Sequence, residues 1–332
     1  MSSQKSTEIS NKLKEAALII VRAKQGKLTD SDKKILLPYL STGAQDRYDE
    51  WLKASEIYLN KLKQLKDNEL AILLDNGMLF DFQENQSAAP NQLLRGKLFA
   101  PIAKGRRKLI EDVVLVTSDD GLTEFKYSGA QLDQSDLDVL LTLLRVLGDA
   151  SLTGNITKIS DENGRHEYTR VRFSRYGFLK ELKKNNQSKN YKNLDASLRR
   201  LGGELEITIK DTGNIRGPIV GKRFVDEATG DMVVDINQDF TTLFKNDQFA
   251  FIDMSERLQL KNGFEKWLHG FVLTHSGESF YSAEKLMELS GSNAKRIRQW
   301  MQRQATPAFE KLAGMEVIFN FQIDGHLYTW TR

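Results

Sequence analysis

Apolar residues recur every three or four positions through much of the first 75 residues, as in Leu13, Ala16 and Ile20. This spacing places the apolar side chains along one face of a helix. Polar residues dominate positions 80–92, which include an Ala-Pro step, and this composition is typical of a linker or a domain edge. We therefore predict a helical N-terminal region over residues 1–90, with a domain boundary at its end.

Beyond residue 90 the pattern changes to shorter segments separated by turn residues. Two β-type segments, residues 112–117 and 122–127, flank Ser-Asp-Asp-Gly and predict a hairpin, and residues 135–147 predict an amphipathic helix. Further along, the order helix, polar turn, helix and paired strands is typical of a winged-helix domain. The elements expected there are a strand at 168–173, helices at 176–184 and 189–201, and strands at 204–210 and 221–225.

The same order of elements recurs near the end of the sequence, without identity between the two copies. The elements expected there are helices at 263–275, 282–289 and 293–304, and a hairpin of residues 317–323 and 327–331 turned at Asp324 and Gly325. The sequence therefore predicts an α+β protein with tandem winged-helix domains, at residues 91–245 and 246–332, preceded by the helical N-terminal region.

Charge is distributed unevenly, although the net charge is only +3. Residues 165–223 contain 15 Lys/Arg and 6 Asp/Glu, whereas the neighbouring segments 109–164 and 224–290 are acidic. A second basic island spans residues 295–303. A third basic cluster, residues 104–108, is equally well explained as a solubilising loop. Basic islands between acidic segments are typical of a polyanion-binding surface.

Residues 293–312, drawn as a helix, separate apolar from polar side chains. The expected core residues are Ile297, Trp300, Met301, Ala305 and Ala308. Arg and Gln on the opposite face suit base edges in the major groove, and Lys and Arg suit phosphates. The residues assigned to DNA binding are Asn293, Lys295, Arg296, Arg298, Gln299, Gln302 and Arg303. An ordinary solvated helix face is the alternative, and Pro307 predicts a kink or break near Thr306.

The central helix expected at 189–201 shows the same division. Its expected buried stripe is Tyr191, Leu194, Leu198 and Leu201. Behind it, Arg216, Lys222 and Arg223 lie where a wing would approach the minor groove or the DNA backbone. The residues assigned to DNA binding are Lys189, Lys192, Asn193, Arg199, Arg200, Arg216, Lys222 and Arg223. A solvated surface is again the alternative.

Several other classes of protein find no support in the sequence. The absence of cysteine excludes disulfides and thiolate metal sites, and no stretch approaches the ~20 apolar residues of a membrane span. Residues 217–223 resemble a phosphate-binding loop that is one residue too short and ends in Arg where Ser or Thr would hold magnesium. The four histidines lack zinc-binding spacing. We expect a cytoplasmic protein without enzymatic activity, cofactor, metal or membrane association.

Four segments carry a resemblance to a known family. Residues 90–99 (PNQLLRGKLF), residues 125–132 (FKYSGAQL) with the Asp-rich helix entry behind them, and residues 289–300 (LSGSNAKRIRQW) are the first three. The fourth is the final hairpin, which ends in Thr331-Arg332. Over residues 90–332 the chain resembles the TrfA family of plasmid replication initiators.

The resemblance implies a protein that binds repeated double-stranded DNA sites, called iterons, at a plasmid origin, promotes duplex opening and recruits the replisome. It also implies a monomer–dimer equilibrium and three host partners: a helicase, a sliding clamp and chaperones. Gln131, Leu132 and Asp133 match only the first half of the family's clamp-binding motif, and we interpret them as a helix entry.

Two alternatives to an initiator stay open. A winged-helix transcriptional regulator that binds an operator would use the same recognition helices. A strand-nicking initiator enzyme, from a different class, would form a covalent adduct with DNA through a tyrosine.

Overall fold

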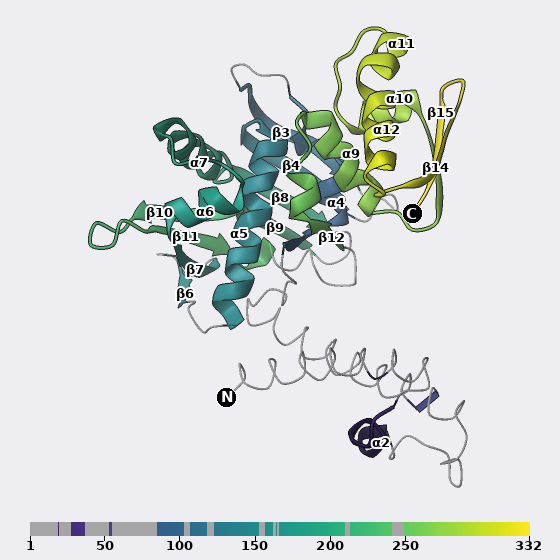
Figure 1. Ribbon diagram of the computed structural model, residues 1–332. Helices are drawn as coiled ribbons and strands as arrows, with labels where there is room; N and C mark the ends of the chain where they lie inside the picture. Colours follow the sequence, from purple (N-terminus) through teal and green to yellow (C-terminus); the bar gives the residue numbers. More distant parts are fainter. Residues whose placement is uncertain are drawn as a thin grey trace. The chain divides into compact units, whose positions relative to one another are not determined.

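The computed structural model describes residues 19, 28–36, 53–54, 85–102, 107–117, 123–152, 157–161, 164, 166–209, 213–240 and 249–332 (Figure 1). The chain divides into two compact units, one of residues 1–81 with 151–154 and one of residues 82–150 with 155–332. The boundary expected between residues 245 and 246 lies outside the described residues.

In the first unit, the described residues include helix α2 (Asp30–Leu36). The hydroxyl of Thr29 accepts a hydrogen bond from the amide of Asp32 at 3.2 Å, and the Asp32 carboxylate accepts one from the amide of Thr29 at 2.9 Å. This reciprocal capping satisfies two amides at the start of the helix. Leu36 is buried with Ile19 and Ala54 in a small apolar cluster. The other helices predicted within residues 1–75 lie outside the described residues.

The second unit is a mixed α/β structure around a long helix, α5 (Gln134–Leu152). Its buried leucines include a stripe at helical spacing: Leu137, Leu140, Leu141, Leu144 and Leu147. One antiparallel sheet has the order β3 (Leu109–Thr117), β4 (Thr123–Ala130), β8 (Glu204–Ile209) and β9 (Gly213–Pro218). The pairing of β3 with β4 confirms the predicted hairpin, whose turn lies outside the described residues.

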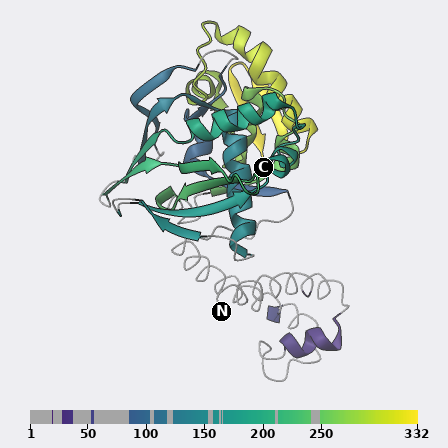
Figure 2. The same cartoon turned by 90° about the vertical axis from the view of Figure 1, so that its left-hand side faces the viewer.

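A second antiparallel sheet has the order β10 (Val220–Val225), β11 (Met232–Asn237), β7 (Glu167–Phe173) and β6 (Thr157–Ser160). Helices α6 (Arg175–Glu181) and α7 (Ser188–Arg200) follow β7 in the chain. The expected pairing of residues 204–210 with 221–225 is wrong, because β8 pairs with β9 and β10 pairs with β11. The chain passes directly from β9 into β10 and so leaves one sheet for the other, as the sheets in Figure 2 illustrate.

The C-terminal part gathers its helices against a three-stranded sheet with the order β13 (Glu278–Ser282), β15 (Leu327–Thr331) and β14 (Phe319–Asp324). The helices are α9 (Gly263–Leu273), α10 (Ala283–Leu289), α11 (Ile297–Trp300), the π-helical segment η3 (Met301–Ala305) and α12 (Thr306–Gly314). Aromatic rings fill the core between them: the Phe309 ring lies 4.9 Å from Tyr328 and 5.2 Å from Trp330. Gly325, at φ +58°, turns the final hairpin.

Part of the predicted linker is folded. Strand β1 (Gln86–Pro90) pairs antiparallel with β12 (Phe249–Asp253), and helix α4 (Asn91–Arg95) follows it. Two short strands, β2 (Phe99–Ala100) and β5 (Leu132–Asp133), pair in parallel beside the start of α5. Helix α8 (Met254–Arg257) joins β12 to the C-terminal helices. Residues 86–92 therefore belong to the folded unit. Residues 80–84, the first part of the predicted linker, lie outside the described residues.

Candidate nucleic-acid interface

The second basic island precedes and forms α11. The helix begins at Ile297, four residues later than predicted, because Arg296 has an extended backbone (φ −127°, ψ 104°) and Gly291 turns the preceding chain at φ +69°. Asn293, Lys295 and Arg296 therefore lie on the segment that leads into the helix rather than on a helical face.

The division between buried and exposed side chains in this region follows the sequence prediction, except that Ile297, expected in the core, is only half-buried. Trp300, Met301, Ala305 and Ala308 are buried. The seven assigned residues, which we call the α11 surface, are all exposed: Asn293, Lys295, Arg296, Arg298, Gln299, Gln302 and Arg303. Within the part of the chain that the structure describes, none of these seven side chains has a hydrogen bond or an ion pair. Their polar groups are available to a partner.

Pro307 changes the helix without ending it. Proline has no amide hydrogen to donate to the carbonyl four residues earlier, and the structure widens the preceding turn into η3. The amide of Thr306 donates to the carbonyl of Met301, five residues back, and Pro307 lies in the first turn of α12. The predicted kink or break near Thr306 is thus a π-helical bulge. Gln302, Arg303 and Gln304 are all exposed on this wide turn.

Three contacts hold this segment against the C-terminal core. The Trp300 ring meets the Phe264 ring of α9 edge to face at 5.2 Å. The hydroxyls of Thr306 and Tyr328 lie 3.0 Å apart. Lys311 of α12 forms an ion pair with Glu265 of α9 at 2.7 Å. Hydrogen bonds from Lys311 and from the Lys261 and Asn262 segment outweigh the effect of burial and lower the pKa of Glu265.

Helix α7 lies within the first basic island, residues 165–223. Leu194, Leu198 and Leu201 are buried as predicted, whereas Tyr191 is only half-buried. The guanidinium of Arg175 lies over the Tyr191 ring at 5.0 Å and pairs with Asp195 at 2.8 Å. Four residues that the sequence assigned to DNA binding are exposed on this helix and form what we call the α7 surface: Lys189, Lys192, Asn193 and Arg199.

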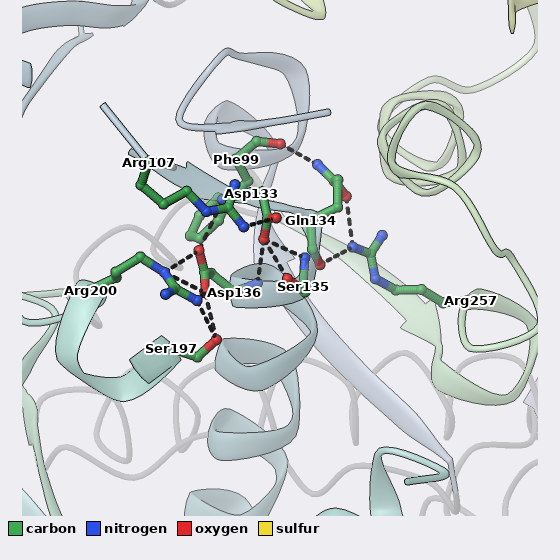
Figure 3. Close-up of polar contacts among 9 residues, drawn as sticks. All are labelled: Phe99, Arg107, Asp133, Gln134, Ser135, Asp136, Ser197, Arg200 and Arg257. Carbon is green, nitrogen blue, oxygen red and sulfur yellow. Dashed lines mark hydrogen bonds and ion pairs between the residues drawn. The ribbon is translucent and has the colours of Figure 1, made fainter. Parts of the chain in front are cut away.

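Arg200 differs from the expectation, because its guanidinium is directed toward the start of α5 (Figure 3). It pairs with the fully buried carboxylate of Asp136 at 2.6 Å, and the Ser197 hydroxyl donates to the same carboxylate at 2.5 Å. Burial alone would lower the pKa of Arg200, but the hydrogen bond and charge of Asp136 outweigh it and raise that pKa. We therefore place Arg200 in the scaffold that holds α7 rather than on its outer surface.

Tyr127 fixes the end of α7. Its hydroxyl donates to the carbonyl of Arg200 at 2.8 Å, and burial followed by the charge of Asp136 raises the pKa of this hydroxyl. A Cβ atom at Gly203 would lie 2.2 Å from the Tyr127 oxygen, closer than atoms can approach. Glycine is therefore required at this position by the close approach of the tyrosine.

The structure separates the three predicted wing residues. Arg216 lies on β9, where its exposed guanidinium pairs with Glu204 of the same sheet. Lys222 and Arg223 lie on β10 of the other sheet. A shallow cavity of about 210 Å³ joins this strand to α7, and its lining residues are Asp195, Arg199, Arg223, Phe224, Val225 and Met232. The structure thus brings Arg199 and Arg223 together and leaves Arg216 elsewhere.

The sequence did not point to Phe224, which lines this cavity, or to Arg170, which lies against its ring. Phe224 is 46% exposed, and the guanidinium of Arg170 lies 5.4 Å from the centre of its ring. Arg170 also pairs with the buried carboxylate of Asp235 at 2.7 Å. Arg170 contributed only to the count of basic residues in 165–223, and the apolar run of residues 224–225 gave no reason to expect an exposed ring.

The described residues also bear on metal sites, membrane spans and the segment similar to a phosphate-binding loop. Among its residues, no group of three or more His, Asp or Glu is arranged to hold a metal ion. None of its helices is long and apolar enough to cross a membrane. The segment that resembled a phosphate-binding loop, residues 217–223, runs through β9 and β10 as extended chain and not as a loop before a helix.

The half-motif for a sliding clamp is part of the folded core. Leu132 is fully buried on β5. The Asp133 carboxylate accepts hydrogen bonds from the amides of Ser135 and Asp136 at 2.9 and 3.2 Å, which is the capping arrangement of a helix start. Burial would raise the pKa of Asp133, but hydrogen bonds from Ser135 and Arg107 outweigh it and lower that pKa. This geometry supports the interpretation as a helix entry.

No protein-family model matches the chain, and no curated protein matches its sequence. Two crystal structures of domains 2 and 3 of RctB are similar to it, both at 11% identity. Their TM-scores are 0.47 and 0.45, with 73% and 72% of this chain and 97% and 95% of those chains covered. The Pi initiator protein in complex with iteron DNA is also similar, at 12% identity and a TM-score of 0.45, over 75% of this chain and 98% of that chain. Because every TM-score lies below 0.5, the proposals below rest on this chain's own residues and their geometry.

Proposed function

We propose that this protein is a replication initiator that binds repeated double-stranded DNA sites through two winged-helix domains, at residues 91–245 and 246–332. The α11 surface is the observation that carries the proposal. Four cationic and three amide side chains stand together over a buried aromatic core, exposed and without partners among the described residues. Free cationic and amide groups in this arrangement suit phosphates and base edges.

The order of elements supports a winged-helix assignment for the C-terminal part. Helix α9, strand β13, helices α10 and α11, and the hairpin of β14 and β15 follow one another. In such domains the later helix enters the major groove, with its first residues at the base edges. Arg298 and Gln299 occupy the first turn of α11, and Lys295 and Arg296 precede it. We assign base contacts to Arg296, Gln299 and Arg303.

The α7 surface supports a second contact with DNA. Lys189, Lys192 and Asn193 are exposed on the first two turns of the helix. The hairpin of β10 and β11 lies beside the later turns, where Arg199 and Arg223 line one cavity. This hairpin, rather than the hairpin of β8 and β9, is the wing that we assign to the first domain. Its Lys222 and Arg223 would bind the DNA backbone.

The resemblance to TrfA-type initiators favours iterons over an operator as the DNA target. The resemblance also implies the promotion of duplex opening and the helicase, clamp and chaperone partners. We carry these, together with the cytoplasmic location expected from the composition, as parts of the proposal. A monomer–dimer equilibrium finds support in β3, which lies at the edge of its sheet with Leu109 81% exposed. An exposed edge strand is a surface on which a second copy can pair.

A nuclease footprint of the purified protein across the DNA that flanks its own gene tests the proposal. The experiment uses moderate salt and excess competitor DNA, because non-specific binding falls steeply with salt. Several evenly spaced direct repeats beside an A/T-rich tract are the expected result. One protected inverted repeat would favour the transcriptional regulator, and absence of any protection would count against sequence-specific binding.

A covalent adduct tests the remaining alternative. A strand-nicking initiator would leave a denaturation-resistant protein–DNA adduct through a tyrosine when magnesium is added. We expect none with supercoiled DNA that carries the protected region. An adduct would overturn the assignment of a non-enzymatic initiator.

A further inference from the structure

The first turns of α5 bind polar groups from two directions, as Figure 3 shows for Arg200 and Arg257. Gln134, Asp136 and Asp138 occupy these turns, and all three are buried. A buried carboxylate costs free energy unless an opposite charge and hydrogen bonds surround it. Its partners are therefore held in defined positions.

Asp136 binds the α7 side. Its carboxylate accepts from the guanidinium of Arg200, at the last turn of α7, and from the hydroxyl of Ser197 one turn earlier. Tyr127 closes the same end of the helix through the carbonyl of Arg200. The α7 surface is thus fixed to α5 at its C-terminal end.

Asp138 and Gln134 bind the C-terminal part. The guanidinium of Arg257, which is 0% exposed, donates to Asp138 at 2.8 Å, to the side-chain oxygen of Gln134 at 2.7 Å and to the carbonyl of Lys266 at 2.9 Å. The ammonium of Lys266 on α9 pairs with the other oxygen of Asp138. Two cations from the C-terminal part therefore share one carboxylate of α5.

Helix α9 continues the connection to the α11 surface. Phe264, two residues before Lys266, contacts the ring of Trp300 in α11, and Glu265 between them pairs with Lys311 of α12. Buried or half-buried contacts therefore run without interruption from α7 through α5 and α9 to α11. Buried ion pairs add little net stability, but they can enforce one geometry over others.

We propose that this network, the α5 junction (Gln134, Asp136, Asp138, Arg200, Arg257 and Lys266), holds the α7 and α11 surfaces at one separation and one rotation. The protein then selects its DNA by the spacing between the two halves of a site as well as by their sequence. The second statement rests on the proposed function, whereas the first concerns the protein alone. The two can be tested separately.

Spin labels measure the fixed geometry without DNA. The sequence contains no cysteine, so Ser188→Cys on α7 and Glu310→Cys on α12, both exposed positions, carry the only two labels. We expect one narrow distance distribution in the full-length protein. The triple variant Asp138→Leu, Arg257→Met and Lys266→Met removes all three charges together, so that none is left buried without a partner. It should broaden the distribution.

A matched control removes an ion pair from the same helix without touching the junction. Arg145 of α5 pairs with Glu181 of α6, and Arg145→Met with Glu181→Leu should leave the distribution narrow. If the triple variant does not fold, Gln134→Ala removes only the side-chain oxygen that accepts from Arg257 and should broaden the distribution less. A broad distribution in the wild-type protein, or an unchanged one in a folded junction variant, would overturn the fixed geometry.

A spacing series tests the consequence for DNA. The probe is a duplex enriched by the full-length protein from a random-sequence pool, with one to five base pairs then inserted between its two protected halves. Five base pairs rotate one half by half a turn, and we expect the wild-type protein to lose roughly 100-fold in affinity. Between the original duplex and the duplex with five inserted base pairs, the folded junction variant should lose much less affinity than the wild type. The control variant should lose as much as the wild type.

The outcomes separate the inference from the proposed function. A wild-type protein that tolerates all insertions would overturn selection by spacing while site-specific binding stands. Failure to enrich any duplex would overturn the proposed function, and selection by spacing with it, while the label distances still decide the fixed geometry.

Discussion

The two basic islands, residues 165–223 and 295–303, are both rich in arginine but differ in how many of their guanidinium groups pair with carboxylates of the protein itself. Within the first island, Arg200, Arg175 and Arg216 each pair with a carboxylate of the same unit. On the α11 surface, all seven polar side chains are without a partner among the described residues. A basic residue in the sequence is thus a candidate for binding DNA only if no carboxylate of the fold has already bound it.

The two regions also differ in their anchors. A fully buried carboxylate, Asp136, holds the end of α7, whereas a partly exposed ion pair, Lys311 with Glu265, and aromatic contacts hold the segment of α11 and α12. We therefore expect substitutions in the α7 region to fall into two classes: those that lower the free energy of unfolding and those that weaken DNA binding. Substitutions on the α11 surface should affect DNA binding alone.

Adjacent arginines of α7 give the largest expected contrast. Arg200→Ala leaves the buried carboxylate of Asp136 without its cation and should lower the free energy of unfolding by about 3 kcal/mol. Arg199→Ala removes an exposed side chain and should change it by less than about 0.5 kcal/mol. Urea unfolding at pH 7 measures both. Equal stabilities of the two variants would show that Arg200 does not belong to the scaffold.

Single substitutions on the α11 surface come next in size. Arg296→Ala, Gln299→Ala and Arg303→Ala should each cost ~1–3 kcal/mol in binding to the selected duplex where the side chain contacts a base. Stability should stay within about 0.5 kcal/mol of the wild type, because these exposed side chains have no partner within the part of the chain that the structure describes. Fluorescence anisotropy with labelled duplex measures the binding.

Lys158→Ala, on the exposed strand β6, is the control for loss of one positive charge. If the triple variant of Arg296, Gln299 and Arg303 still gave the wild-type footprint, the assignment of base contacts to the α11 surface would be wrong.

The sequence predicted the α11 surface better than the α7 surface because the information was local. Helical spacing alone separated Trp300 and Met301 from Gln299 and Gln302. The pairing of Arg200 with Asp136, 64 positions earlier, left no trace in the pattern around α7. A charge count treats both kinds of arginine alike.

Strand pairing failed for a similar reason. Residues 213–218, GNIRGP, contain two glycines and a proline and do not resemble a strand, yet they form β9 and take the place beside β8 that we expected residues 221–225 to occupy. The choice of partner strand depends on the whole sheet and not on local propensity. The wing was consequently assigned to residues on two sheets.

That division gives a third prediction. Arg223→Ala should weaken binding to all duplexes alike and reduce the slope of log affinity against log salt by about 1, because a phosphate contact releases counterions and carries no sequence information. Arg216→Ala should change the slope much less, since Glu204 already binds this guanidinium on the other sheet. Titrations at four salt concentrations compare the two. An equal change of slope would restore Arg216 to the wing.

The smallest expected effect concerns the anchor of α12 and its dependence on pH. The pKa of Glu265 is lowered in the folded protein, so its ion pair with Lys311 stabilises the fold above the ordinary pKa of glutamate, and this stability is lost as the pH falls through the lowered value. Because the pair is partly exposed, Glu265→Gln should cost only about 0.5 kcal/mol at pH 7. The difference from the wild type should vanish at an acid pH below that lowered value, where Glu265 is protonated and, like the glutamine that replaces it, carries no charge. Urea unfolding at the two pH values measures it, and a difference that persists at acid pH would assign the effect of Glu265 to packing instead of charge. In that case the contrast between the two regions would rest only on the side chains that have no partner among the described residues.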